Sequence, residues 1–318
     1  MTDPTLDIPL DFAAYVRERH EFARQTTVNG HPDYAFAGDT RLRAKLAALG
    51  PLRVVAEMVT ATAASMRRQI ALMNMLAVGP SQFSSLYEIN RHCARTLGIP
   101  VPSLFVESSP HINAYTIATD DRAPIVIVSS STIDALDEDE LRFVIGHECG
   151  HIHNLHGVYN TMGWMVSRIA LQGALLGALV GSVLIPVIYA LERVSSLGLA
   201  AWSRAGEITC DRAGLLCAEN PRSGETALAK LAAPFVSRKF GAINPQAIME
   251  QTKRASQSLA RWEESMHSHP ILGKRIQAVQ WFAQSTLFAE RRPDLQLPLP
   301  GMSLDVIDAK VSQLLAVL

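Results

Sequence analysis

Several features that would assign this chain to a familiar class are missing from its sequence. The 318 residues include only four cysteines and no CxxC pair, so neither a zinc ribbon nor a disulfide-stapled secreted domain is expected. The 29 basic and 30 acidic residues nearly cancel, and the chain lacks the clustered Lys and Arg that nucleic-acid binding needs. The N-terminal segment has acids where a signal peptide needs basic residues, and no apolar core follows. We therefore expect a cytoplasmic protein with reduced cysteines and no nucleic-acid partner.

Periodicity in the sequence predicts a mainly helical α+β fold. Hydrophobic residues make up 48% of the chain, enough for one substantial core or two smaller ones. Most segments repeat apolar residues at helical spacing, while three short β-type runs predict a small, mostly antiparallel sheet. The expected helices cover residues 11–24, 53–77, 84–97, 204–218, 224–238, 244–267 and 270–289, and the expected strands cover residues 103–108, 112–117 and 124–130.

One further helix carries a dense group of ionisable residues. Asp137 and Glu140 form a capping-box-like start, and the sequence HECGH follows. His147 and His151 are four residues apart, so both imidazoles lie on one helix face and are close enough to share a metal ion. Glu148 lies beside that face, within reach of a water on such a metal. This spacing predicts a zinc site whose third ligand comes from elsewhere.

Two sources of a third ligand can be tested in the sequence. The extension HExxHxxGxxH fails, because Asn154 stands at its glycine position and Gly157 at its histidine position. A later helix offers Glu207 and Asp211, again four residues apart. Glu207 would complete a His2Glu zinc site with an open fourth position, while Asp211 would hold a ligand histidine through its second nitrogen. The alternative is that both acids pair with neighbouring arginines on a solvated helix.

The sequence contains the segments INAYT, HECGH, GEITCD and HSHPILGKRI, in this order along the chain. Together they resemble the motifs of the HtpX-like and CAAX-prenyl-protease-like zinc metallopeptidases, over roughly residues 84–285. The resemblance implies a gluzincin-type fold: an HExxH helix, a second helix with the glutamate, a small sheet with a substrate-binding edge strand, and one zinc ion per chain. The chain is then divided into an N-terminal helical region (1–82), a metallopeptidase domain (83–290), and a proline-rich linker with a C-terminal helix (291–318).

The expected chemistry is peptide hydrolysis by a metal-activated water, with Glu148 as the general base. By resemblance, His269 is expected near the metal as an oxyanion donor, a substrate contact or a reversible fourth ligand; a solvent-exposed helix start is the alternative. Asn113, Ala114 and Tyr115 lie in the strand that the family implies is the substrate-binding edge, where main-chain pairing would hold an extended peptide. Tyr115 is equally consistent with an ordinary strand aromatic.

Other residues near these motifs are expected to support the site without binding metal. His153 and His156 do not repeat the four-residue spacing, so capping, packing or support of a ligand is expected of them. Cys149 and Cys210 lie inside the two zinc motifs, where the resembled family commonly has other small residues, and their spacing predicts packing positions off the metal-facing side. Arg275 is expected to anchor its helix through an acid near the site.

An apolar stretch separates the two zinc motifs. Residues 169–191 contain no charge and carry a GxxxGxxxG series, so by length they are a transmembrane candidate. However, His151 and Glu207 must meet on one ion, and a single span between them would put the ligands on opposite sides. We therefore expect a helical insertion, at about 160–201, that forms a hairpin in the core, in a homo-oligomer interface or shallowly against a membrane surface.

Three functions compete. The first is a zinc-dependent endopeptidase that cleaves extended protein or peptide segments, and the second is a catalytically silent zinc-binding interaction protein that assembles through its apolar hairpin. The third, a CAAX-type prenyl-protein protease, needs more membrane spans than this chain offers. Glu148 favours the first, because a structural zinc site does not need a general base. The first eighty residues are a candidate shield for the cleft, and in that case trimming them raises activity.

Overall fold

The computed structural model describes residues 27–28, 31–47, 62, 65–119, 122–157, 185–233, 236, 240–255 and 270–315. Its main sheet has four strands in the order β3-β4-β6-β5. The strands are β3 (Leu76–Ala77), β4 (Ser103–Glu107), β5 (Ala114–Thr119) and β6 (Arg122–Ser129). β4 runs parallel to β6, whereas the β3–β4 and β5–β6 pairings are antiparallel. The predicted small, mostly antiparallel sheet is confirmed, and β5 lies at its edge.

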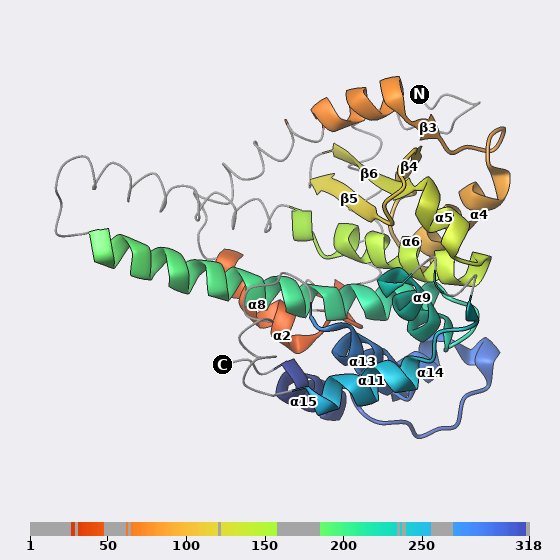
Figure 1. Cartoon of the computed structure of the whole chain (residues 1–318). Coiled ribbons are helices and arrows are strands. Elements are labelled where there is room, and N and C mark those ends of the chain that lie inside the picture. Colours follow the sequence, from red (N-terminus) through yellow and green to blue (C-terminus); the bar gives the residue numbers. More distant parts are fainter. Residues whose placement is uncertain are drawn as a thin grey trace.

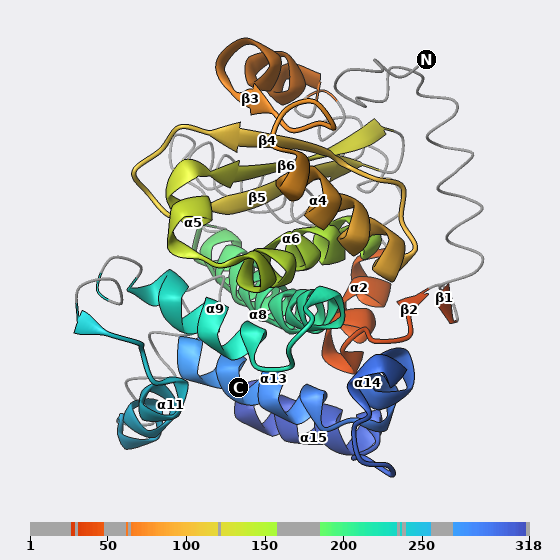
Figure 2. The ribbon, with the colours of Figure 1, turned by 90° about the vertical axis from the view of Figure 1, so that its right-hand side faces the viewer.

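Helices surround the sheet and stack beneath it in layers (Figures 1 and 2). The sheet lies on α6, α6 lies on the long helix α8, and α13 and α15 lie on the far side of α8. The helices are α2 (Ala37–Ala47), α4 (Ser84–Leu97), α5 (Ser130–Ala135), α6 (Glu138–His153), α8 (Ile185–Cys217), α9 (Ser223–Ala232), α11 (Pro245–Arg254), α13 (Leu272–Ala283), α14 (Thr286–Arg291) and α15 (Leu304–Leu315). The short elements are strands β1 (Thr27–Val28) and β2 (His31–Pro32), which pair with each other, and the 3-10 helix η1 (Pro293–Leu295).

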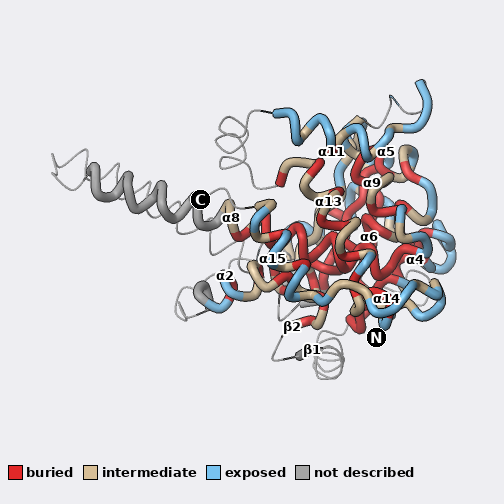
Figure 3. Tube along the Cα trace, turned by 90° about the horizontal axis from the view of Figure 1, so that it is seen from below, coloured by how far each residue is buried: buried red, intermediate tan, exposed pale blue. Residues whose placement is uncertain are grey.

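The side chains of β6 alternate between the two faces of the sheet, as expected for a strand with both faces covered. Val126 and Val128 join the large core that α4 and α6 contribute to. Ile125 and Ile127 form a second cluster with Ala71 from the helical residues 65–74 on the opposite face. The sheet is therefore held between helices, and its inner face shares one core with α6. Buried residues gather at the centre of the molecule around α6 (Figure 3).

Helices α6 and α8 make an unusually close contact, because small residues face each other where they cross. A β-carbon added at Gly146 would lie 2.8 Å from Cys217 Cβ, and one added at Gly150 would lie 2.8 Å from Ala213 Cβ. Real β-carbons do not approach so closely, so only glycine permits this separation of the helices. The contact brings the HECGH segment of α6 directly onto the second half of α8.

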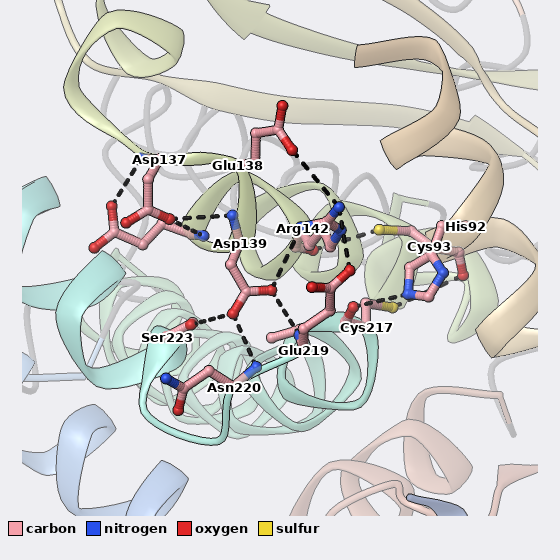
Figure 4. A network of polar contacts seen from close by, with 12 residues as sticks. His92, Cys93, Asp137, Glu138, Asp139, Arg142, Cys217, Glu219, Asn220 and Ser223 are labelled. Atoms are coloured by element: carbon pink, nitrogen blue, oxygen red, sulfur yellow. Dashed lines mark hydrogen bonds and ion pairs between the residues drawn. The ribbon is translucent and has the colours of Figure 1, made fainter. Parts of the chain in front are cut away.

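The first turn of α6 is tied to the turn between α8 and α9 (Figure 4). The expected capping box is present, with Asp137 and Glu140 each bonding the backbone N–H of the other. Asp139 accepts hydrogen bonds from the backbone N–H groups of Glu219 and Asn220 at 2.6 and 2.9 Å, and from the hydroxyl of Ser223. These bonds fix the register of α6 against α8 at the end away from the histidines.

Several expected helices have other bounds in the structure. The helix predicted over residues 204–218 begins at Ile185 as α8, so residues 185–201 belong to it and not to a separate insertion. The helices predicted over residues 224–238 and 244–267 end at Ala232 and Arg254.

The helix predicted over residues 53–77 is wrong at its end, because Leu76 and Ala77 pair with β4 as strand β3. The helix predicted over residues 270–289 is two helices, because Ser285 caps α14 by accepting a hydrogen bond from Phe288 N at 3.0 Å. Residues 11–24 and 169–184 lie outside the described residues. In the part of the chain that the structure describes, no helix has the length and apolar character that a membrane crossing requires.

Candidate metal centre

Helices α6 and α8 bring the two predicted ligand motifs together. His147 Nε2 and His151 Nε2 lie 3.2 Å apart. The Glu207 carboxylate faces both, with Oε2 at 3.7 Å from His147 Nε2 and Oε1 at 3.6 Å from His151 Nε2. Zinc–nitrogen bonds of about 2.0–2.1 Å in a tetrahedral site separate the ligand atoms by roughly 3.4 Å. The three side chains therefore fit one zinc ion without rearrangement of the backbone.

Glu207 and Asp211 are both buried, so the alternative that they form ion pairs on a solvent-exposed helix face is wrong. Glu207 is 4% exposed and Asp211 is 1% exposed. Burial would lower the pKa of His151, but the hydrogen bond that its ring donates to Glu207 and the charge of Glu148 raise it. Arg275 balances part of the negative charge of these buried acids. A divalent metal ion held by the histidines and Glu207 would balance more of it.

Asp211 lies behind His147, where it orients the imidazole ring. Its Oδ1 accepts a hydrogen bond from His147 Nδ1 at 3.0 Å, which leaves Nε2 unprotonated toward Glu207. Arg275 on α13 donates to Asp211 from Nε at 2.9 Å and from Nη2 at 2.6 Å, and its Nη1 lies 3.1 Å from Glu207 Oε2. Burial would raise the pKa of Asp211, but Arg275 and then His147 lower it. The acid that Arg275 was expected to bind is thus Asp211.

Cys210 lies closer to the candidate centre than its sequence position suggested. A donor atom of Cys210 lies within 4.8 Å of donor atoms of His147 and His151, so the expectation that it points away from the metal-facing side is wrong. Its Sγ lies 3.4 Å from His156 Nδ1, which in turn lies 3.0 Å from His151 Nδ1, whereas the Glu207 carboxylate faces the Nε2 atoms. Burial and the charge of Glu207 raise the pKa of the Cys210 thiol in the metal-free protein. The candidate metal ligands are therefore His147 and His151, through their Nε2 atoms, and the Glu207 carboxylate that faces both. Cys149 is buried in the main core, as expected.

His151 is also supported from behind, through a second histidine. His156 Nδ1 lies 3.0 Å from His151 Nδ1, and His156 Nε2 lies 3.1 Å from Asp39 Oδ2. Burial lowers the pKa of His156. Burial would raise the pKa of Asp39, but His156, Arg43 and the hydrogen bond from Thr209 lower it to about 2. The supporting role expected of His156 has a structural basis, whereas no pattern in the sequence pointed to Asp39.

The candidate centre opens into a cleft of about 760 Å³. Asn113, Ala114 and Tyr115 line it together with the candidate ligands, Glu148 and Arg275. Thr116 Oγ1 donates to Glu148 O at 3.3 Å, which fixes edge strand β5 beside the HECGH helix. Tyr115 also packs against the cluster of Ile125 and Ile127 on the outer face of the sheet, so it contributes to strand packing as well as lining the cleft. Of the described residues that line the cleft, none comes from the part of the chain before Ile112. His269 lies outside the described residues.

Comparison with known proteins places this fold and site in a family. The model of peptidase family M48 matches residues 80–282, and the chain belongs to that family. It is 31% identical over 235 residues to the plastoglobule-localized metallopeptidase 48 of Arabidopsis thaliana, an alignment that covers 70% of this chain and 64% of the relative. It is 31% identical over 153 residues to the protease HtpX of Xanthomonas euvesicatoria, covering 42% of this chain and 52% of the relative. The chain thus spans between about half and two thirds of these relatives.

Proposed function

We propose that the chain is a zinc-dependent endopeptidase that holds one zinc ion through His147, His151 and Glu207. The observation that carries the proposal is the convergence of two Nε2 atoms and one carboxylate within 3.2–3.7 Å at the floor of a cleft. Family membership supports proteolysis. The polar groups behind each histidine support metal binding, because they leave both Nε2 atoms unprotonated.

Glu148 is the proposed general base. It follows His147 on α6, is 6% exposed and lines the cleft. When bound, zinc polarises the scissile carbonyl and makes a water acidic enough to react near neutral pH. Glu148 accepts the proton of that water and passes it to the leaving nitrogen. A catalytically silent zinc protein would not need a carboxylate at this position.

The proposed substrate is an extended protein or peptide segment that pairs with β5. Ser129 N donates to Asn113 O at 2.9 Å, so the backbone groups of Asn113 and, by alternation, Tyr115 face β6. The backbone groups of Ala114 and Thr116 therefore face the free edge above the cleft. Pairing there requires no particular side chain, so weak sequence preference is expected.

Some parts of the proposal rest on the sequence alone. His269 remains a proposed substrate contact, oxyanion donor or reversible ligand near the zinc ion. Residues 169–191, of which 185–191 form the start of α8, remain a proposed contact with a membrane surface or with a second copy of this chain, and the protein is proposed to be cytoplasmic. The division at residues 82 and 290 is likewise proposed.

The experiment compares zinc content and casein cleavage for the native chain, Glu148→Gln and Glu138→Gln. Glu138 is an acid in the first turn of the same helix and serves as the matched control. All three chains are expected to bind about one zinc ion, and only Glu148→Gln is expected to lose at least ~100-fold in cleavage rate. A native chain without zinc, or a Glu148→Gln variant that cleaves at the native rate, would overturn the proposal. Zinc in every chain with cleavage by none would favour the silent interaction protein.

A further inference from the structure

Asp39 brings a buried negative charge from the N-terminal region to the back of the candidate metal centre. It lies in the first turn of α2 and is 0% exposed. Trp202 Nε1 donates to its Oδ1 at 2.9 Å, and Thr209 Oγ1 donates to its Oδ2 at 2.9 Å. His156 Nε2 lies 3.1 Å from the same Oδ2. A carboxylate held by three side chains from two other parts of the chain has a fixed position.

The contacts around His156 determine which of its nitrogens carries a proton. An ionised carboxylate only accepts hydrogen bonds, so the nitrogen facing Asp39, Nε2, is the donor. Nδ1 of the neutral ring is then the acceptor, and the groups that face it, His151 Nδ1 and the Cys210 thiol, lie at 3.0 and 3.4 Å. His151 Nδ1 is the nearer of the two, so we assign it as the donor, with the His151 proton on Nδ1. Its Nε2, which faces Glu207, is left with a free lone pair, as a metal ligand requires.

We propose that Asp39 and His156 are positioning residues that set the tautomer and ring orientation of His151 through the hydrogen-bond series Asp39–His156–His151. The inference rests on the zinc site proposed above. It adds to that site a residue outside the segment, residues 80–282, that matches the peptidase family. The N-terminal region thereby becomes part of the metal site rather than a removable cover.

The surroundings of His156 fit this role. The ring lies edge-to-face against Trp202, with 5.5 Å between the ring centroids. A β-carbon added at Gly206 would lie 3.1 Å from His156 Cε1, so glycine leaves room for the ring one residue before Glu207. On the other side of the centre, Asp211 acts on His147 directly. Each candidate ligand histidine is thus supported by a carboxylate. Asp211 contacts His147 directly, and Asp39 acts on His151 through the imidazole of His156.

The test measures zinc affinity of full-length variants by competition with a chromophoric chelator, and the visible spectrum of the cobalt-substituted proteins. His156→Leu and Asp39→Ala interrupt the series and are expected to weaken zinc binding about 10–100-fold and to change the cobalt spectrum. His156→Gln keeps an amide oxygen for His151 and an N–H for Asp39, so its affinity is expected within about threefold of native.

Asp308→Asn is the matched structural control. Asp308 Oδ2 accepts from Ala37 N at 2.9 Å and so tethers α2 without touching His156. This variant is expected to lower the melting temperature and leave zinc affinity and the cobalt spectrum unchanged. If His156→Leu and Asp39→Ala bind zinc as tightly as the native chain, or if Asp308→Asn weakens binding as much as they do, the inference is overturned. A native chain that binds no zinc would instead overturn the proposed function.

Discussion

Gly150 of α6 lies directly against Ala213 of α8, and a β-carbon at Gly150 would come within 2.8 Å of Ala213 Cβ and 3.1 Å of Cys210 Cα. These contacts involve backbone and Cβ atoms, which cannot turn aside. The distance between the two helices, and with it the distance from His151 to Glu207, therefore depends on the missing side chain of Gly150.

Gly150→Ala is expected to separate the helices. Overpacking of this kind costs about 1–3 kcal/mol of the free energy of unfolding, and zinc affinity should fall because Glu207 moves away from His151. The double variant Gly150→Ala with Ala213→Gly removes the closer of the two contacts and should recover part of the zinc affinity, although glycine in a helix retains a stability cost. Urea unfolding and chelator competition measure the two effects. Equal affinity of the native chain and Gly150→Ala would contradict the argument.

Arg275→Lys is expected to weaken zinc binding, although both side chains carry a positive charge. A lysine ammonium cannot donate to both oxygens of Asp211 and also pair with Glu207, as the guanidinium does. The buried carboxylates then bind protons more readily, and zinc affinity near neutral pH should fall about tenfold. The control is Arg291→Lys, which changes a pair with Asp33 away from the cleft. Chelator competition at pH 7 checks the prediction, which fails if both variants bind zinc equally well.

Asp39 is expected to make stability depend on pH in the acid range. Its pKa in the folded protein is about 2, below the ordinary value of 3.8, with His156, Arg43 and Thr209 around it. A depressed carboxyl pKa stabilises the fold above the unfolded value, here by about 2 kcal/mol, and this stabilisation is lost as pH falls from about 5 toward 2. The difference in unfolding free energy between the native chain and Asp39→Asn, measured metal-free in urea, should therefore shrink between pH 6 and pH 3. A constant difference would show that the charge of Asp39 does not contribute.

Ala114→Pro is expected to weaken substrate binding with little loss of stability. Proline removes an N–H that faces the free edge of β5 and leaves the bonds to β6 in place. Tyr115→Pro removes an N–H that faces β6, so it should destabilise the protein instead. Peptide cleavage kinetics should show a higher KM for Ala114→Pro, with thermal unfolding as the stability control. An unchanged KM would exclude main-chain pairing at this position.

Local sequence signals predicted much of the fold. Helix α4 matches its expected range, and the capping box of α6 depends only on Asp137 and Glu140 three residues apart. Strand β3 was missed because its two residues are extended only through pairing with β4. The break at Ser285 was missed for a related reason, since the adjacent Thr286 N donates to Met302 O across the chain at 3.0 Å.

The candidate site shows the same contrast between residues that local sequence signals reveal and residues that only long-range packing brings in. The spacing of His147, Glu148 and His151 is local, and Glu207 could be found from its own motif. Asp39 could not be found, because it reaches His156 across 117 residues only after α2 packs beneath α8. The role of His156 depends on Leu155, whose positive φ of 59° turns the chain so that His156 returns to His151 just beyond the end of α6.

Anomalous diffraction at the zinc absorption edge, from crystals of the zinc-loaded chain, shows whether His147, His151 and Glu207 bind one zinc ion. We expect a single strong peak about 2.0–2.2 Å from His147 Nε2, His151 Nε2 and a Glu207 carboxylate oxygen. A peak bound by Cys210 in place of Glu207, or no peak between the two histidines, would contradict the account.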